Sequence, residues 1–291
     1  LKTLILLTFL FNISLTANAT VTISPEQLEE INTVPGNWFF DRELIDADEK
    51  LLKLFKPYYQ RIGELGIKLN SKDRCRYHTR KNLLKADNQN DWDCFFAFRG
   101  MLRDTKKCLP SVEEVFSRTK WEGDIKGRIR YVGIAPLPYR YTLREENGEL
   151  VATVKIYYKN WDKLEDSEKE QLHQRTREGA DLWVQHRPKG THFKIEMIIV
   201  DSKKDADFKV KATPKSTRGP YLRTHSINWS YRVFAHELGH MLGLDDEYDQ
   251  IHATLFRNSR CTNDSLMCSS SSIHFPKYYW YLIFRRPFCQ L

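Results

Sequence analysis

The sequence predicts an α+β protein in which a mainly helical N-terminal region precedes a larger region of mixed strands and helices. Apolar residues recur at helical spacing from Ser24 to about Arg118, and strand-type segments begin near Trp121. The 291 residues are 41% hydrophobic, enough for one large domain or for an ordinary domain beside a smaller one. We therefore divide the chain into residues 1–19, 20–120 and 121–291.

Residues 1–19 have the composition of a secretory signal peptide. Lys2 supplies a positive start, residues 4–15 are mostly apolar, and Ala17-Asn18-Ala19 matches an A-x-A cleavage signal. The apolar run is too short to span a bilayer comfortably, and no later stretch is long and apolar enough to do so. We expect a secreted, periplasmic or extracellular protein that starts near Thr20 and has no membrane span after signal removal.

The N-terminal region carries two helix signals and no recognisable catalytic run. Ser24-Pro25-Glu26-Gln27 is typical of a helix start, because proline fits the first helical position. Residues 44–65 carry apolar side chains at helical spacing, and Pro57 among them predicts either a kinked helix or two helices. We interpret the region as a pro-segment or a helical accessory domain.

Strand signals follow. Residues 128–135 and 139–143 have strand composition, and Asn147-Gly148 lies between residues 139–144 and 150–158. An Asn-Gly pair between two such runs is a strong signal for a β-hairpin.

The rest of the chain predicts helices and strands in turn. Residues 164–186 predict one long amphipathic helix, and residues 193–200 and 208–211 predict strands. Residues 221–227 predict a short edge strand after a Gly-Pro break. A second helix is expected to start near Asn228 or Ser230 and to run to about residue 242.

Charge and cysteine content restrict the functional classes. Lys and Arg exceed Asp and Glu by 46 to 38, and this modest excess is spread along the chain without a nucleic-acid motif, so we predict no nucleic-acid partner. Six cysteines in a secreted chain predict disulfide bonds, with 15 possible pairings. They form two groups of three, so at least one bond must join the groups if all are paired: Cys75, Cys94 and Cys108; Cys261, Cys268 and Cys289.

The run from His236 to Asp246 is the strongest chemical signal. His236 and His240 are four residues apart, so on a helix their imidazoles project from one face and can bind one metal ion, usually zinc. Glu237 follows the first histidine, where a carboxylate can reach metal-bound water. Gly243 allows the chain to leave the helix sharply, and Asp246, three residues later, is the predicted third ligand.

The acidic residues around Asp246 leave two alternatives open. Asp245 and Glu247 are its immediate neighbours and could replace it as the ligand if the register differs. Together with Asp249 they could also bind calcium, although no EF-hand spacing is present and a solvated acidic loop is the simpler interpretation.

With these motifs, residues 121–291 resemble the metzincin clan of zinc endopeptidases. That clan carries an extended H-E-x-x-H-x-x-G-x-x-[H/D] motif and a methionine turn beneath the metal, and Ser265-Leu266-Met267 is the candidate for that turn here. The resemblance implies a zincin-like fold with a mixed twisted sheet, a long backing helix, an active-site helix and the methionine turn.

The chain departs from the common pattern of the clan at two positions. Most members have histidine as the third ligand, whereas Asp246 is similar to the aspartate of the small snapalysin-type bacterial proteases. An anionic ligand should make zinc a somewhat weaker Lewis acid. Some families have a tyrosine two residues after the methionine, but Ser269 stands there, which leaves Tyr248, Tyr278 and Tyr279 as possible substitutes.

The resemblance implies hydrolysis of a protein or peptide substrate, with Zn²⁺ as cofactor and Glu237 as general base. It implies that an extended substrate lies along the edge strand near Tyr221, Arg223 and His225. Cys75 is similar to the pro-segment cysteine that occupies zinc in some families, although the even cysteine count favours disulfides. The alternative function is a secreted zincin-fold binding or toxin-like protein whose helical N-terminal region carries the activity. Nothing in the sequence indicates an oligomeric state.

Overall fold

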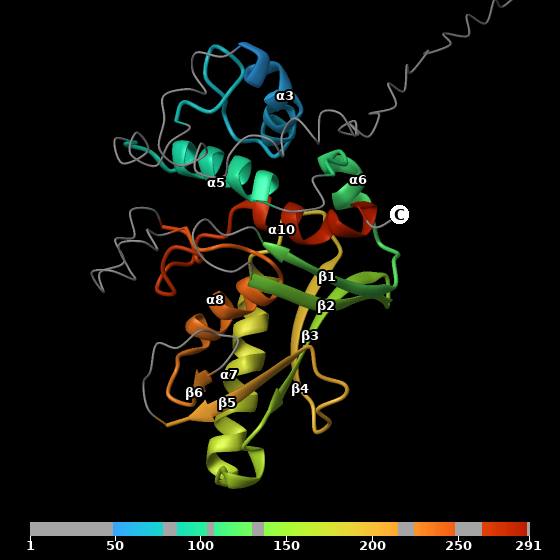
Figure 1. Cartoon of the computed structure of the whole chain (residues 1–291), viewed down its shortest axis with the longest axis vertical. Helices are drawn as coiled ribbons and strands as arrows, with labels where there is room; N and C mark the ends of the chain where they lie inside the picture. Colours follow the sequence, from blue (N-terminus) through green and yellow to red (C-terminus); the bar gives the residue numbers. More distant parts are fainter. Residues whose placement is uncertain are drawn as a thin grey trace, which may run out of the picture.

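The computed structural model of the chain describes residues 49–77, 86–103, 108–129, 137–214, 224–247 and 264–289. Within these ranges it combines six α-helices with a six-stranded mixed sheet (Figure 1). The predicted mixture of helices and strands is therefore confirmed. The predicted signal peptide, the early helix start at Ser24, and Tyr221 and Arg223 lie outside the described residues. In the described part of the chain, no helix is both long and apolar enough to cross a membrane.

The sheet is organised around β3. Its strands are β1 (Gly123–Ile129), β2 (Leu137–Glu146), β3 (Glu149–Tyr158), β4 (Phe193–Ile199), β5 (Phe208–Thr213) and β6 (Thr224–Ser226). β1 and β2 extend antiparallel from the first half of β3, β4 runs parallel along it, and β5 pairs in parallel with its last residues. β6 pairs in parallel with β5 at the edge of the sheet.

The predicted hairpin joins β2 to β3. Asn147 and Gly148 have φ values of 52° and 81°. Two consecutive residues with positive φ form the turn whose twist matches that of paired strands, and the Asn-Gly pair adopts it with little strain. The turn places Glu146 opposite Glu149 and fixes the register of the ladder.

One face of the sheet is covered by a long helix, α7 (Asp166–Gln185), which also packs against α8 (Tyr231–Met241). A capping box between Glu165 and Glu168 begins α7. Gly179 lets the two helices approach closely, because a methyl group there would lie 3.0 Å from the backbone nitrogen of Ala235. The indole of Trp183 donates a hydrogen bond of 2.9 Å to the Ala235 carbonyl, so α7 fixes the position of α8.

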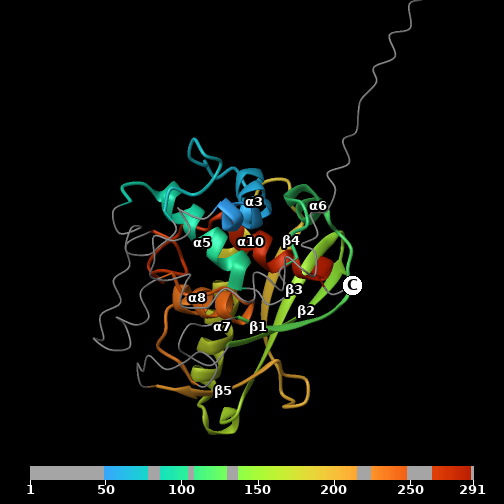
Figure 2. The same cartoon turned by 45° about the horizontal axis from the view of Figure 1, so that its top comes forward.

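The N-terminal helices are α3 (Glu49–Glu64), α5 (Gln89–Arg103) and α6 (Val112–Ser117). α3 is a single helix that contains Pro57, so the two-helix alternative is wrong. These helices lie at one end of the sheet, together with α10 (Lys277–Phe284) and the short 3₁₀ helix η3 (Arg286–Cys289) (Figure 2).

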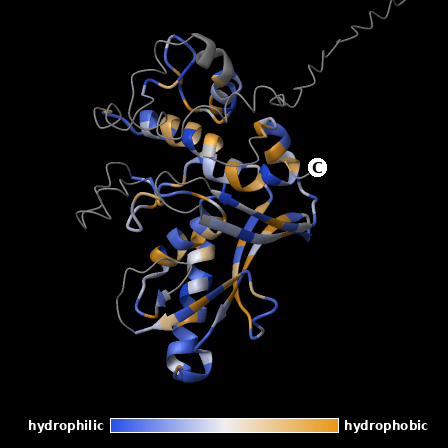
Figure 3. Cartoon of the chain, viewed as in Figure 1, coloured by the Kyte–Doolittle hydropathy of each residue, from blue (hydrophilic) through white to orange (hydrophobic). Residues whose placement is uncertain are grey.

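α10 lies between the N-terminal helices and the sheet. The Tyr281 hydroxyl donates to the Pro110 carbonyl at 2.8 Å, and the Tyr141 hydroxyl of β2 donates to the Ile283 carbonyl at 2.7 Å. Residues 278–284 are all buried, as expected for a helix that is apolar on every side. Apolar residues along β3 and β4 belong to the same hydrophobic core (Figure 3).

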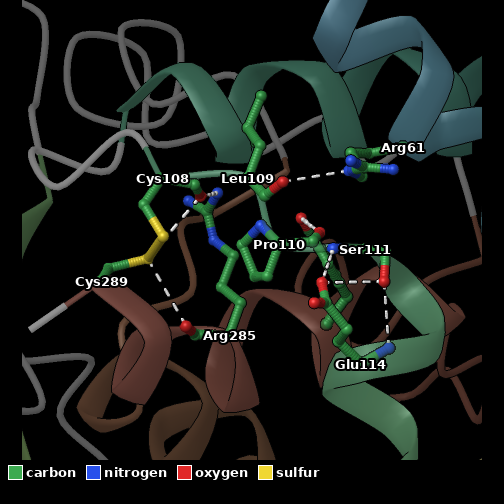
Figure 4. Close-up of a disulfide and its surroundings, with 9 residues drawn as sticks. Arg61, Cys108, Leu109, Pro110, Ser111, Glu114, Arg285 and Cys289 are labelled. Atoms are coloured by element: carbon green, nitrogen blue, oxygen red, sulfur yellow. Dashed lines mark hydrogen bonds between the residues drawn. A yellow bond between two sulfur atoms is a disulfide. The ribbon is translucent and has the colours of Figure 1, made fainter. Parts of the chain in front are cut away.

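Disulfide bonds join Cys75 to Cys94 and Cys108 to Cys289, and Cys268 is disulfide-bonded as well. The Cys108–Cys289 bond joins the two sequence groups, as the count of cysteines predicts (Figure 4). Because Cys75 is paired with Cys94, its likeness to a zinc-occupying pro-segment cysteine is not supported. The Cys75–Cys94 and Cys108–Cys289 bonds are compatible with an extracellular protein.

Candidate metal centre

Helix α8 presents His236 and His240 on one face, and Asp246 completes the group. The two imidazole rings lie 4.8 Å apart between centroids and are buried. The Asp246 carboxylate oxygen Oδ1 lies 3.3 Å from Nε2 of His236 and 3.0 Å from Nε2 of His240. The ligand atoms of the three side chains all lie within 4.8 Å of one another, so this group could hold a metal ion.

The end of α8 turns the chain back toward the histidines. Gly243 has φ 86°, its N–H donates to the His240 carbonyl at 2.9 Å, and the Leu244 N–H donates to the Gly239 carbonyl at 2.9 Å. These two bonds form a Schellman motif, which requires a residue with positive φ at this position. The motif confirms the role predicted for Gly243 and directs the following loop so that Asp246 faces both imidazoles.

Each histidine is oriented by a backbone carbonyl. Nδ1 of His236 donates to the Leu266 carbonyl at 2.8 Å, and Nδ1 of His240 donates to the Leu244 carbonyl at 3.0 Å. Because a carbonyl can only accept, each Nδ1 carries a proton, and Nε2 is the ring atom of each histidine that faces Asp246. Metal-binding histidines are commonly held in this way.

Opposite charges within the site shift the pKa values of its members. Burial raises the pKa of the Asp246 carboxyl, but the two imidazoles together lower it well below its usual range. Burial lowers the pKa of His240, but Asp246 outweighs it and raises that pKa to about 9. The buried site therefore pairs a carboxylate with two strongly attracted nitrogen donors, and two imidazoles with one carboxylate are a ligand set that suits zinc.

Glu237 lies beside these three residues without belonging to the group that converges on one point. Its side chain is half-buried, and its carboxylate interacts electrostatically with His236, His240 and Asp246. Burial raises the pKa of its carboxyl above the ordinary value. A carboxylate with a raised pKa is a better proton acceptor at neutral pH than an ordinary glutamate.

The three consecutive acidic residues have different partners. Asp245 forms an ion pair of 3.7 Å with Arg99 of α5, and Asp246 faces the histidines. The Glu247 carboxylate accepts hydrogen bonds from Ser265 and Tyr278. This geometry favours Asp246 over Asp245 as the third ligand. The calcium hypothesis gains no support, because these side chains do not converge on a common point, and Asp249 lies outside the described residues.

Glu247 connects Asp246 to the turn that contains Met267. Its N–H donates to the Met267 carbonyl at 3.0 Å, and its buried carboxylate also hydrogen-bonds to Tyr279. The Tyr279 hydroxyl in turn accepts the Met267 N–H at 3.3 Å. Tyr278 and Tyr279 are thus buried partners of Glu247, and Tyr248 lies outside the described residues.

Met267 lies beneath α8, where a methionine turn is expected. It is fully buried, and a methyl group built on Gly239 would overlap its sulfur. The preceding residue, Leu266, accepts the hydrogen bond from His236, so the same turn orients His236 and supports the helix. The glycine between the two histidines is therefore required by packing.

Replacing Gly239 with alanine is expected to destabilise the fold by about 1–3 kcal/mol, because the new methyl group overpacks the Met267 sulfur. Gly63 provides a matched control in α3, where the nearest atom to a new methyl group is 3.9 Å away. Gly63→Ala is expected to stabilise by about 0.4–1 kcal/mol. Chemical denaturation of both variants measures the difference, and equal effects would show that Met267 does not pack there.

Arg286 binds the backbone at the C-terminal end of α8. The sequence did not indicate this role. Its guanidinium is buried and donates to the carbonyls of Leu242 and Gly243, at 2.9 Å for Gly243, and it also lies 4.0 Å above the ring of Tyr139. Arg99 and Glu247 were likewise not recognised as supports of the site. No local pattern identifies any of the three, because their partners lie far away in the sequence.

The predicted substrate strand is only partly described. His225 lies on β6, but its side chain is fully buried and its Nδ1 lies 2.9 Å from the Tyr158 hydroxyl. It also packs against Trp229 and Phe234. His225 therefore supports the core behind the edge strand, and only its backbone remains a candidate for contact with a substrate.

The chain matches no model of a known protein family, no curated protein and no solved structure. Its own residues are therefore the sole basis for a functional proposal.

Proposed function

We propose that the chain is a secreted zinc-dependent endopeptidase of the metzincin type. One observation carries the proposal: His236, His240 and Asp246 converge on a point beside Glu237, with Met267 under the same helix. A purely structural zinc site has no need for a carboxylate base at this position. The two disulfide bonds fit the oxidising environment that a secreted protein encounters.

The donors that the chain offers fit zinc in a catalytic setting. Such sites take three protein ligands and leave a position open, whereas structural zinc sites are usually closed by four ligands. The two Nε2 atoms and the Asp246 carboxylate supply three. Bound at this set, zinc would supply Lewis acidity toward a peptide carbonyl and lower the pKa of water.

Glu237 would move the proton. Its carboxylate can accept a proton from the attacking water and pass it to the leaving amine nitrogen, which splits the peptide into a carboxylic acid and an amine. The raised pKa of Glu237 makes its carboxylate a stronger proton acceptor than an ordinary glutamate. His236 and His240 cannot serve as the base, because their Nδ1 protons are bound to carbonyls and their Nε2 atoms face Asp246.

The arrangement of the fold supports the metzincin assignment. A mixed sheet, a long helix α7 behind α8 and a methionine-containing turn are the features that the resemblance implies. The aspartate ligand makes the snapalysin-type proteases the nearer comparison within the clan. Helices α3, α5 and α6 precede residues 121–291, the part of the chain that the resemblance covers.

Casein or gelatin hydrolysis by the purified full-length protein tests the proposal. We expect about one zinc per chain and cleavage that stops with a chelator and returns when zinc is restored. A chelator-treated sample without added zinc and a zinc-only blank are the controls. Zinc bound without cleavage of any protein tested would contradict the proposal and favour the zincin-fold binding protein.

A further inference from the structure

Helix α5 of the N-terminal region contacts two chain segments beside the metal centre. Arg99 pairs with Asp245 at 3.7 Å, and both side chains are nearly buried, at 13% and 12% exposure. Nearer the start of α5, the Gln89 side chain accepts the N–H of Asp264 at 3.3 Å. Thus one helix meets the loop of the third ligand and the segment that leads into the methionine turn.

A third contact strengthens this attachment. Asp93 of α5 pairs with His274 at 3.3 Å, and His274 lies in the segment that follows the methionine turn. Hydrogen bonding to Asp93 raises the pKa of His274. Three side chains of α5 therefore reach segments that adjoin the metal centre.

The N-terminal region is also attached to α10 and η3. The Cys108–Cys289 disulfide joins them, and the Arg285 guanidinium donates to the Cys108 carbonyl at 2.8 Å (Figure 4). Arg61 of α3 donates to the neighbouring Leu109 carbonyl at 3.1 Å, so α3 is held by the same segment. Gly100 of α5 fits against Leu282, since a methyl group there would lie 2.6 Å from its side chain.

The same C-terminal elements also hold the metal loop. Tyr278 and Tyr279 of α10 bind Glu247, and Arg286 of η3 binds the end of α8. The N-terminal region and the metal centre thus share one structural support. Removal of the region would expose a large apolar surface on α10, whose residues 278–284 are all buried.

We propose that Arg99 is a positioning residue for the metal centre, and that residues 49–117 are a permanent part of the working protein instead of a removable pro-segment. The inference rests on the proposed metal site. Asp245 and Asp246 are adjacent carboxylates in a buried loop, and two like charges side by side repel each other. The Arg99 guanidinium compensates the charge of Asp245 and holds it away from the histidines, so that Asp246 alone is directed at them.

Zinc affinity tests the role of Arg99 without a requirement for turnover. In competition with a chromophoric chelator, Arg99→Ala is expected to weaken zinc binding about tenfold, the lower end of the loss that follows when a residue that supports the ligands is removed. Arg99→Lys should recover most of the affinity, because it restores the charge. The control is Arg175→Ala, which removes a surface ion pair with Glu178 on α7 and should leave zinc binding unchanged.

A double-mutant cycle separates positioning from general destabilisation. Asp245→Asn should weaken zinc binding to a similar extent, and the double variant should be no worse than either single one. The visible absorption of bound Co²⁺ should change in Arg99→Ala and return toward wild type in Arg99→Lys. If Arg99→Ala fails to fold, Arg99→Gln and Asp245→Asn carry the same test.

Two results would overturn the inference. One is wild-type zinc affinity and an unchanged Co²⁺ spectrum in folded variants at Arg99 or Asp245. The other is a secreted, zinc-loaded protein whose intact mass shows that residues 49–117 are absent, with a start near residue 120. We expect instead that the secreted protein retains residues 49–117, which the Cys108–Cys289 disulfide links to the C-terminal end of the described chain. If the wild type binds zinc but cleaves nothing, the proposed protease activity fails while this inference stands.

Discussion

Glu237→Gln is expected to keep its zinc and to lose hydrolysis almost completely. The amide has nearly the same shape as the carboxylate but cannot accept the water proton, and positioned proton transfer contributes about 10²–10⁴-fold to rates. Glu237 is not among the residues that converge on the metal, so zinc stoichiometry should remain near one. The measurement is kcat/KM on a protein substrate together with metal content, each compared with wild type.

Glu178→Gln is the matched control for this variant. It makes the same chemical change on α7, where the half-buried Glu178 pairs with Arg175 and accepts a hydrogen bond from Gln174, away from the metal centre. Its activity should equal that of the wild type. Substantial turnover by Glu237→Gln would exclude Glu237 as the base and would require another proton acceptor.

Asp246→Ala is expected to weaken zinc binding on the order of 100-fold or more, because binding free energies of about 10–16 kcal/mol at structural zinc sites are shared among four ligands. The loss of a third ligand also removes the negative charge that attracts His236 and His240. Hydrolysis should disappear at zinc concentrations that saturate the wild type. Chelator competition measures the affinity, and high added zinc should restore part of the activity.

The neighbouring residue Asp245 provides the comparison for this result. Asp245→Asn removes one charge from the same loop, yet it should cost only about tenfold, because it breaks the ion pair with Arg99 but leaves Asp246 facing the histidines. A larger loss in Asp245→Asn than in Asp246→Ala would reverse the ligand assignment.

Elements with a clear local signal were predicted well from the sequence. The Asn147-Gly148 hairpin follows from backbone preferences at two residues, and the residues 164–186 helix is observed as α7, Asp166–Gln185. Residues 193–200 are likewise observed as β4, Phe193–Ile199. In each case the sequence signal lies within one element or one turn.

Elements without a periodic pattern were not predicted. α10 has the sequence KYYWYLIF, which is apolar on every side and therefore shows no amphipathic repeat. Its burial is a tertiary effect of packing between α5, α6 and the sheet. β1 begins at Gly123, earlier than the predicted strand at residues 128–135, because pairing with β2 extends it through polar residues.

The residues of the candidate site also fall into those that a local pattern predicts and those that it does not. Helical spacing alone places His236 and His240 together, and Gly243 indicates the sharp turn that follows. Spacing from Gly243 favours Asp246 over Asp245, but it does not predict the ion pair of Asp245 with Arg99, which lies 146 residues earlier in the chain (245 − 99). The contacts of Glu247 and Arg286 are also long-range, so spacing could not predict them.

The central claim is that His236, His240 and Asp246 bind one zinc ion. X-ray absorption at the zinc edge of the loaded full-length protein tests it most directly. We predict a four-coordinate shell with two imidazole nitrogens at about 2.0–2.1 Å and oxygen ligands at about 2.0–2.2 Å, without sulfur. The imidazole signal should be lost in a His236→Ala/His240→Ala double variant. A shell that contains sulfur, or an imidazole signal unchanged in that variant, would contradict the account.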